Sequence, residues 1–155
     1  MKRVVILGST GSIGMSALDV IRSHPDRYTV VGLSAHSQSA LVQQQAREFK
    51  VKTVALTAGT VAGMDVLSGP DAASELVRDT APDIVLNGIA GAAGFLPSLT
   101  AVRLGIPLAL ANKESLVVGG HFIRTEAAQT GANILPVASE HSAIFQCLRG
   151  ERPAD

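Results

Sequence analysis

The chain begins Met1-Lys2-Arg3-Val4-Val5-Ile6-Leu7-Gly8-Ser9-Thr10-Gly11-Ser12-Ile13-Gly14, a short apolar run followed by three regularly spaced glycines. The run Val4–Leu7 is too short for a signal peptide or a membrane span and is typical of a buried parallel strand. Glycines in a G-x-x-G-x-x-G pattern directly after such a strand are a variant of the dinucleotide-binding fingerprint. They allow a tight turn, close approach of the backbone to a pyrophosphate, and close packing of the next helix. The alternative is a turn whose glycines serve the fold alone.

The loop supplies a first set of candidate cofactor-binding residues. Backbone amides of Thr10–Ile13 would face phosphate at the positive end of the helix that follows. The candidates are Gly8, Thr10, Gly11, Ser12 and Ile13.

Beyond this loop, short apolar runs alternate with longer segments of helical periodicity. Strict alternation of this kind, with strands apolar on both faces, predicts an α/β fold: a Rossmann-like, doubly wound parallel sheet with helices on both faces. Residues 57–69 contain three glycines and are expected to form a loop around a short strand. The expected strands are Val4–Leu7, Thr29–Leu33, Thr53–Leu56, Asp83–Leu86, Pro107–Leu110 and Asn133–Val137, and the expected helices are Ser12–Ser23, Ser39–Phe49, Asp71–Thr80, Ala92–Leu104 and Glu114–Thr130.

Composition excludes several classes of function. With 155 residues, 46% of them hydrophobic, the chain can bury one ordinary core. Lys and Arg number 13 and so do Asp and Glu, so no electrostatic signature of nucleic-acid or anionic-membrane binding exists. The single cysteine, Cys147, excludes an internal disulfide and fits a reducing, cytoplasmic compartment. The polar tail at residues 149–155 would suit either a linker or a frayed terminus.

The end of the second expected strand indicates which dinucleotide fits. NAD-binding domains usually carry an Asp or Glu there, which accepts from the ribose 2′-hydroxyl. Here the sequence is Leu33-Ser34-Ala35-His36-Ser37-Gln38, without an acid. A 2′-phosphate would not be repelled, and His36, Ser37 and Gln38 offer donors, so NADPH is favoured over NADH. No Lys or Arg stands in this segment, and His36 could instead be an ordinary exposed loop residue.

Two later segments also follow strands. The small residues of Gly88–Gly94 would let the backbone approach a flat group, or pack a helix tightly against the sheet. Asn112-Lys113-Glu114 lies at the edge where open parallel sheets bind ligands. Asn112 and Glu114 could simply cap and begin a helix. Lys113 has no such reason to stand at the positive end of a helix, so it is a candidate catalytic or substrate-binding residue.

Three segments together resemble the 1-deoxy-D-xylulose 5-phosphate reductoisomerases. They are Gly8–Gly14, Ala111-Asn112-Lys113-Glu114-Ser115-Leu116-Val117 and Ser139-Glu140-His141-Ser142-Ala143-Ile144-Phe145-Gln146. The resemblance implies an NADPH-binding Rossmann domain at residues 1–137 and the beginning of a truncated catalytic domain at residues 138–155. It also implies an oxidoreductase activity of isoprenoid precursor synthesis, in which NADPH and Mg²⁺ or Mn²⁺ serve the conversion of 1-deoxy-D-xylulose 5-phosphate to 2-C-methyl-D-erythritol 4-phosphate. Members of the family commonly form homodimers.

By the same resemblance, individual residues acquire roles. Asn112 and Glu114 would lie near NADPH. Lys113 and Ser139 would contact the phosphosugar, and Glu140 would bind both the metal and the substrate. Lys113 and Glu140 are then the candidate catalytic residues, with Glu140 as the candidate metal ligand.

One departure from the family's pattern concerns activity. The family's motif reads Asp-Ser-Glu-His, and Ala138 stands in place of the Asp. In an extended segment, positions 138 and 140 would share one face, so an Asp and a Glu there could hold one ion, which Ala138 prevents. The family's chain also continues well beyond residue 155. We therefore expect NADPH binding without catalytic competence for this chain alone.

Two alternatives stay open at this point. One is another G-x-x-G-x-x-G oxidoreductase, such as a semialdehyde dehydrogenase, for which Cys147 would be the nucleophile. Its apolar surroundings in sequence instead predict a packed and inert cysteine. The other alternative is a nucleotide-binding domain without chemistry.

Overall fold

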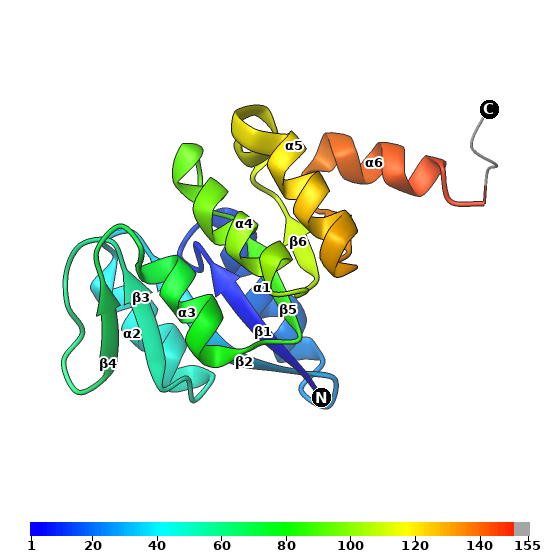
Figure 1. The fold of residues 1–155 in the computed structure, drawn as a ribbon. Helices are drawn as coiled ribbons and strands as arrows, with labels where there is room; N and C mark the ends of the chain where they lie inside the picture. The colour runs from blue at the N-terminus through cyan, green and yellow to red at the C-terminus, as the bar shows by residue number, and fades with distance from the viewer. Residues whose placement is uncertain (151–155) are drawn as a thin grey trace.

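The computed structural model describes residues 1–150, which form alternating strands and helices (Figure 1). Most of the tail that was expected to be a linker or a frayed terminus, residues 151–155, lies outside the described residues. The strands are β1 (Lys2–Leu7), β2 (Tyr28–Ala35), β3 (Thr53–Leu56), β4 (Asp65–Ser68), β5 (Ile84–Asn87), β6 (Leu108–Leu110) and β7 (Ile134–Pro136). The helices are α1 (Ser12–Ser23), α2 (Ser39–Glu48), α3 (Ala72–Thr80), α4 (Phe95–Arg103), α5 (Lys113–Thr130) and α6 (Ser139–Cys147), with a 3-10 turn η1 (Ala92–Gly94) before α4.

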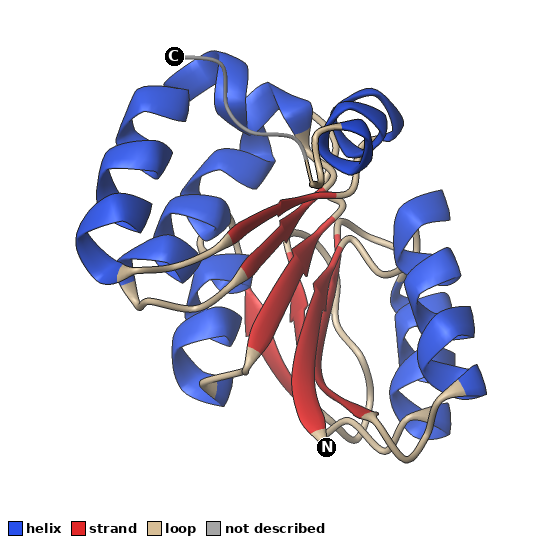
Figure 2. Cartoon of the chain, turned by 90° about the vertical axis from the view of Figure 1, so that its right-hand side faces the viewer, coloured by secondary structure: helices blue, strands red, loops and turns tan. Residues whose placement is uncertain are grey.

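All strands pair in parallel within one seven-stranded sheet of order β4-β3-β2-β1-β5-β6-β7. The order runs outward from β1 to β4 and then resumes on the other side of β1 with β5. Helices α1 and α2 pack on one face of the sheet, and α3, α4 and α5 pack on the other (Figure 2). This arrangement confirms the predicted Rossmann-like, doubly wound fold.

The central strand β1 shows why the sheet is covered on two sides. Val5 and Leu7 belong to the core layer beneath α3 and α4, whereas Val4 and Ile6 belong to the layer beneath α1 and α2. Successive side chains of a strand point to opposite faces, so an uninterrupted apolar run is buried only between two layers of helices. All four side chains are buried.

Most predicted elements agree with the structure, and the differences have local causes. Helix α1 and strand β3 have the expected bounds, and β4 is the short strand expected within residues 57–69. The helix expected at Ala92–Leu104 is instead divided into η1 and α4. Helix α5 is interrupted at Gly119 (φ −157°, ψ 37°), where a β-carbon would lie 2.3 Å from Cε2 of Phe95. The ring of Phe95 on α4 therefore occupies the space that a side chain at position 119 would need.

Two predictions for the C-terminal segment are wrong. Ala138 and Glu140 do not lie in an extended segment that shares one face, because α6 begins at Ser139 with Ala138 as its N-cap residue. The Ser-Glu-His sequence thus forms the first turn of a helix. Cys147 is exposed rather than packed, and α6 buries none of its residues. Every helix within residues 1–150 is too short or too polar to span a membrane.

Substitution of Gly119 tests the contact between α4 and α5. Gly119→Ala places a methyl group against Phe95, and we expect a loss of about 1–3 kcal/mol in the free energy of unfolding because of overpacking. Gly120→Ala is the matched control: its β-carbon meets nothing closer than 3.6 Å. The control should gain up to about 1 kcal/mol from helix propensity. Equal unfolding midpoints in urea for the two variants would contradict the proposed contact.

Candidate functional site

Most of the residues singled out in the sequence gather at the carboxyl edge of the sheet. Leu7, which ends β1, pairs with Ser34 of β2 on one side and with Asn87 of β5 on the other. Leu110 of β6 in turn pairs with Asn87 and with Pro136 of β7. The loops that follow these strands therefore share one edge, and the strand order reverses between β1 and β5. Such a switch point is where open α/β sheets bind ligands.

The three glycines of the first loop have different constraints. Gly8 has a φ of +78°, and a β-carbon on it would lie 2.9 Å from the carbonyl oxygen of Gly88. A β-carbon on Gly14 would lie 2.4 Å from the carbonyl oxygen of Gly8, so α1 packs directly on the loop. Gly11 is different, since its φ is −82° and its β-carbon would stand 3.4 Å from the nearest protein atom. The fold thus requires the outer two glycines and leaves room at the middle one.

The N-terminus of α1 is open to an anion. Gly11 is its N-cap residue and provides no side-chain cap, and the first turn contains no acidic residue. The amide of Met15 is the one that donates to the carbonyl of Gly11, at 2.9 Å, so the amides of Ser12–Gly14 precede the first helical hydrogen bond. Ser12 and Ile13 are exposed and Thr10 is half-buried. The loop offers unshielded N–H groups and the positive end of a helix, which suits a phosphate group.

A buried polar pair supports the loop from behind, and the sequence analysis did not identify it. Ser9 donates its hydroxyl to Oε1 of Gln45 at 2.8 Å, while Nε2 of Gln45 donates to the carbonyl of Ser9 at 3.0 Å. Both residues are buried. The amide of Gly8 also donates to Oγ of Ser34 at 3.1 Å. These bonds fix the loop to β2 and α2, so the side chain of Ser9 is a support and not a ligand.

The predicted 2′-phosphate residues lie beside this loop. His36, Ser37 and Gln38 follow β2 directly and are all exposed. Gln38 is the N-cap residue of α2 and makes no side-chain cap. Their position next to the loop agrees with the expectation, and their contact with a cofactor stays a prediction.

Asn112 is the most heavily used polar residue at the edge. It is 2% exposed, and its side-chain oxygen accepts from the amide of Ser115 at 2.8 Å, as an N-cap does. Its Nδ2 donates to the carbonyl of Ile89 at 2.6 Å, to the carbonyl of Gly91 at 2.8 Å and to Oε2 of Glu114 at 3.1 Å. The hydrogen-bonding groups of the Asn112 side chain are therefore all paired within the protein, and the side chain positions the loop after β5.

Asn87 fixes the same loop from the strand side. It is fully buried, donates to the carbonyl of Gly94 and to Oγ of Ser98 at 2.8 and 2.7 Å, and accepts from the amide of Ile89 at 3.0 Å. Sequence reasoning missed this residue. The available signal was a polar amide at the end of an otherwise apolar strand, where burial requires a full set of partners.

Lys113 and Glu140 come together although they are far apart in sequence. Nζ of Lys113 lies 3.8 Å from Oε1 of Glu140, and both side chains are more than half exposed. Ser139 donates its hydroxyl to Oε2 of Glu140 at 3.1 Å. The pKa of Glu140 lies below its usual value, first because its own backbone N–H donates to the carboxylate, and then because of Ser139 and Lys113. The carboxylate is therefore ionised at neutral pH and available to a cation.

The described residues do not by themselves complete a metal site. Within residues 1–150 no three His, Cys, Asp or Glu side chains are grouped closely enough to hold an ion. Glu140 provides one hard oxygen ligand of the kind that Mg²⁺ or Mn²⁺ takes. The other ligands would have to come from elsewhere.

Residues 4–120 match the family model of 1-deoxy-D-xylulose 5-phosphate reductoisomerase. The chain belongs to this family. It is 53% identical to the reductoisomerase of Rhodococcus jostii over 96% of its own length, and 43% identical to that of Thermodesulfovibrio yellowstonii over 97%. It spans only 38% and 42%, respectively, of those two relatives.

Solved reductoisomerase structures share the fold. One, described as a complex with NADPH, fosmidomycin and magnesium, superposes with a TM-score of 0.91 at 38% identity, covering all of this chain and 41% of that one. The Zymomonas mobilis enzyme in complex with NADPH gives 0.88 at 36% identity, covering 94% of this chain and 41% of its own. A homoserine dehydrogenase from Thiobacillus denitrificans, 20% identical with a TM-score of 0.64, shares the fold alone.

A substitution at Asn112 separates capping from loop positioning. Asn112→Ala should lower the free energy of unfolding by about 2 kcal/mol, because it removes a cap and leaves buried carbonyls unpaired. Asn112→Asp retains the cap acceptor but loses the donor to Ile89 and Gly91, so we expect no rescue in urea unfolding. Asn133→Ala, at an exposed position, is the control and should change stability by less than about 0.5 kcal/mol. Full rescue by Asp would show that capping alone matters.

Proposed function

We propose that this chain binds NADPH along the carboxyl edge of its sheet and supplies the cofactor domain of a reductoisomerase. The observation that carries the proposal is the uncapped N-terminus of α1 together with the loop that leads into it. Of the three glycines in that loop, only Gly11 has room for a β-carbon, so the backbone there is open to a ligand. A pyrophosphate could approach the backbone there and accept from the amides of Thr10, Ser12 and Ile13. The amide of Gly11 already donates to the carbonyl of Gly8 at 3.1 Å, which closes the turn of the loop. Solved relatives described as NADPH complexes support the choice of ligand.

The preference for NADPH over NADH follows from the end of β2. No carboxylate stands there to accept from a ribose 2′-hydroxyl, and the exposed side chains of His36, Ser37 and Gln38 can donate to a 2′-phosphate. Bound NADPH would supply a hydride to a carbonyl group. Gly88–Gly94, held by Asn87 and Asn112, would form the floor beside the nicotinamide.

The proposed substrate-binding side of the edge is formed by Lys113, Ser139 and Glu140. A phosphosugar such as 1-deoxy-D-xylulose 5-phosphate is an anion with several hydroxyl groups, which an exposed ammonium and a hydroxyl can bind. Glu140 would ligate Mg²⁺ or Mn²⁺, which polarises a carbonyl group as a Lewis acid. The product would be 2-C-methyl-D-erythritol 4-phosphate. Glu114 contributes through Asn112 and the first turn of α5.

The division into residues 1–137 and 138–155 is also part of the proposal. It is supported by α6, which follows β7 and buries none of its residues, as expected of the start of another unit.

A cytoplasmic location and homodimer formation are proposed because the chain belongs to the reductoisomerase family. Because the metal ligands are incomplete within residues 1–150, we propose that the chain alone binds cofactor without turnover. Consumption of NADPH by the purified chain with the phosphosugar and Mn²⁺ would overturn that proposal.

The alternative of a semialdehyde dehydrogenase is excluded by the family assignment. Cys147 lies exposed at the end of α6. The other alternative was a nucleotide-binding domain that catalyses no reaction. The assay of NADPH consumption described above tests this alternative for the 155-residue chain.

Gly11→Ala gives the sharpest test of the cofactor site. The methyl group has room in the protein but would stand where the pyrophosphate must approach the backbone. The substitution should therefore weaken cofactor binding without destabilising the fold. We expect the affinity for NADPH in calorimetry to fall by about tenfold or more, equal to about 1.4 kcal/mol, with an unchanged unfolding midpoint. Gly120→Ala, remote from the loop, should leave the affinity unchanged. Normal NADPH affinity in Gly11→Ala would place the cofactor elsewhere.

Substitutions at Ala138 separate helix capping from metal binding. Asp and Asn are equally good N-caps, so both should stabilise α6 by about 1 kcal/mol relative to Ala. Only Asp adds a carboxylate near Glu140. In Mn²⁺ titrations of the chain, we expect tighter binding for Ala138→Asp than for Ala138→Asn. Equal Mn²⁺ affinities would mean that position 138 does not contribute a ligand.

A further inference from the structure

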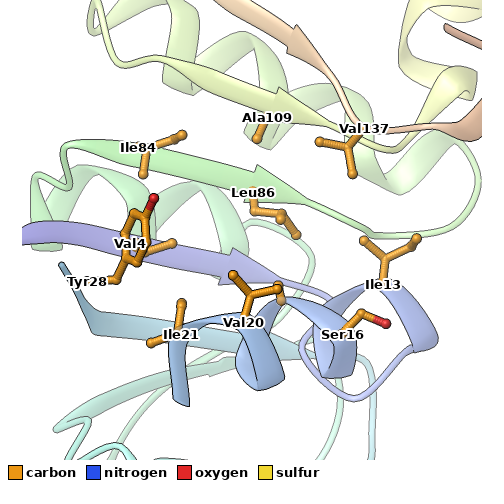
Figure 3. Close-up of a pocket in the computed structure, with 11 residues that line it drawn as sticks. Val4, Ile13, Ser16, Val20, Ile21, Tyr28, Ile84, Leu86, Ala109 and Val137 are labelled. Atoms are coloured by element: carbon orange, nitrogen blue, oxygen red, sulfur yellow. The ribbon is translucent and has the colours of Figure 1, made fainter. Parts of the chain in front are cut away.

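An apolar groove lies between α1 and the strands β5 and β6, and at the end nearest the cofactor edge it is lined by Ile13 of α1 and by Val137, which follows β7. Its volume is about 320 Å³. Figure 3 shows Ile13, Ser16 and Val20 of α1 facing Leu86, Ala109 and Val137 across it. No charged residue lines the groove, and its polar side chains are Ser16 and Tyr28.

The groove exists because one half of the sheet is covered on a single face. Helices α1 and α2 lie over β1, β2 and β3, whereas α3, α4 and α5 lie on the opposite face. On β5, Val85 points to the core beneath α3–α5, and its neighbours Ile84 and Leu86 point the other way. Parallel strands with apolar residues on both faces are normally covered on both.

Exposed side chains mark the uncovered strip. Val20 is 55% exposed on α1 and Leu135 is 39% exposed on β7. Both would lose water contact if a further element lay against this half of the sheet. Burial of apolar side chains is favourable, so an uncovered strip of this kind is a candidate surface for association.

We propose that a helix from the part of the reductoisomerase chain that continues beyond α6 docks in this groove. The larger part of the relatives lies outside the matched region, since the chain spans 38% and 42% of the two described above. Val137 forms one wall and is followed within two residues by α6, so the chain passes from the sheet into α6 beside the groove.

The lining defines the chemistry of the docked helix. An uncharged, aliphatic groove fits the apolar stripe of an amphipathic helix, with residues repeating at three- and four-residue intervals. Covalent connection makes this docking intramolecular and so raises the effective concentration of the segment. The helix would complete the second face of the sheet and attach the rest of the enzyme to the cofactor domain.

Cysteine reactivity at paired positions tests the proposal. Ser16→Cys places a thiol in the groove, and Ser68→Cys places one at an exposed position at the far edge of the sheet. Each is made in the 155-residue chain and in the same residues continued by the remaining part of the R. jostii relative. Peptide mass spectrometry then measures the alkylation rate at each position.

We expect both thiols to react at similar rates in the 155-residue chain. In the continued protein, alkylation of Ser16→Cys should slow by about tenfold or more, as at a protected site, and Ser68→Cys should not change. Equal rates at position 16 in both proteins would overturn the proposal. Protection at position 16 already present in the 155-residue chain, and lost on dilution, would also overturn it and identify a second copy as the occupant.

A stability measurement provides a second reading that needs no labelling. Val20→Asp should hardly change the melting temperature of the 155-residue chain, because Val20 is more than half exposed there. In the continued protein it should lower the melting temperature by about 4 °C or more. Ala62→Asp, at an exposed position of the loop before β4, serves as the control in both proteins. Equal small shifts for Val20→Asp in both proteins would again contradict docking.

Discussion

The close approach of three backbone segments at the end of β1 is the constraint on which the site depends. The carbonyl of Gly8 lies where a β-carbon of Gly14 would stand, and the carbonyl of Gly88 lies where one of Gly8 would stand. No side chain fits at either glycine. This contact brings α1 down onto β1 and brings the loop after β5 against the first loop. As a result, the uncapped end of α1 and the switch point of the sheet coincide.

Buried amides then give this edge a defined shape. Asn87 and Asn112 both form hydrogen bonds to the loop after β5, and Gln45 of α2 forms hydrogen bonds to Ser9 in the first loop. No buried side-chain nitrogen or oxygen within residues 1–150 lacks a partner. Because unpaired buried polar groups cost about 1–3 kcal/mol each, such networks favour one arrangement of the loops over others. The site is thus preorganised by side chains that are already hydrogen-bonded within the protein.

Local patterns in the sequence predicted the fold well because the fold depends on local rules. Two-sided apolar runs such as Val4–Leu7 and the glycine spacing after them specify a strand, a turn and a helix in order. The kink at Gly119 could not be predicted, because it depends on where the ring of Phe95 comes to lie. Likewise, positions 138–140 were predicted to be extended, with alternate side chains on one face as in a strand, but α6 begins at Ser139. The period alone does not distinguish the two in so short a segment.

The candidate site was predicted only in part, because local motifs identify residues but not the contacts between them. Lys113 and Glu140 were identified through motifs, and their approach to 3.8 Å depends on the parallel pairing of β6 with β7. Asn112 was expected either to cap a helix or to lie near NADPH, and the structure shows the cap. Its hydrogen bonds to the loop after β5 could be identified only in the structure, and its contact with NADPH stays a prediction. The uncovered face of β5–β7 is also a property of strand order, which sequence patterns do not specify.

We propose above that the first loop and the open end of α1 hold the pyrophosphate of NADPH. Amide chemical shifts of the ¹⁵N-labelled chain, recorded while NADPH is added, test it residue by residue. We expect the largest changes at the amides of Thr10–Ile13, with further changes at residues 36–38 for NADPH that NADH does not produce. Unchanged shifts at Thr10–Ile13 at saturating NADPH, or changes confined to another part of the sheet, would contradict it.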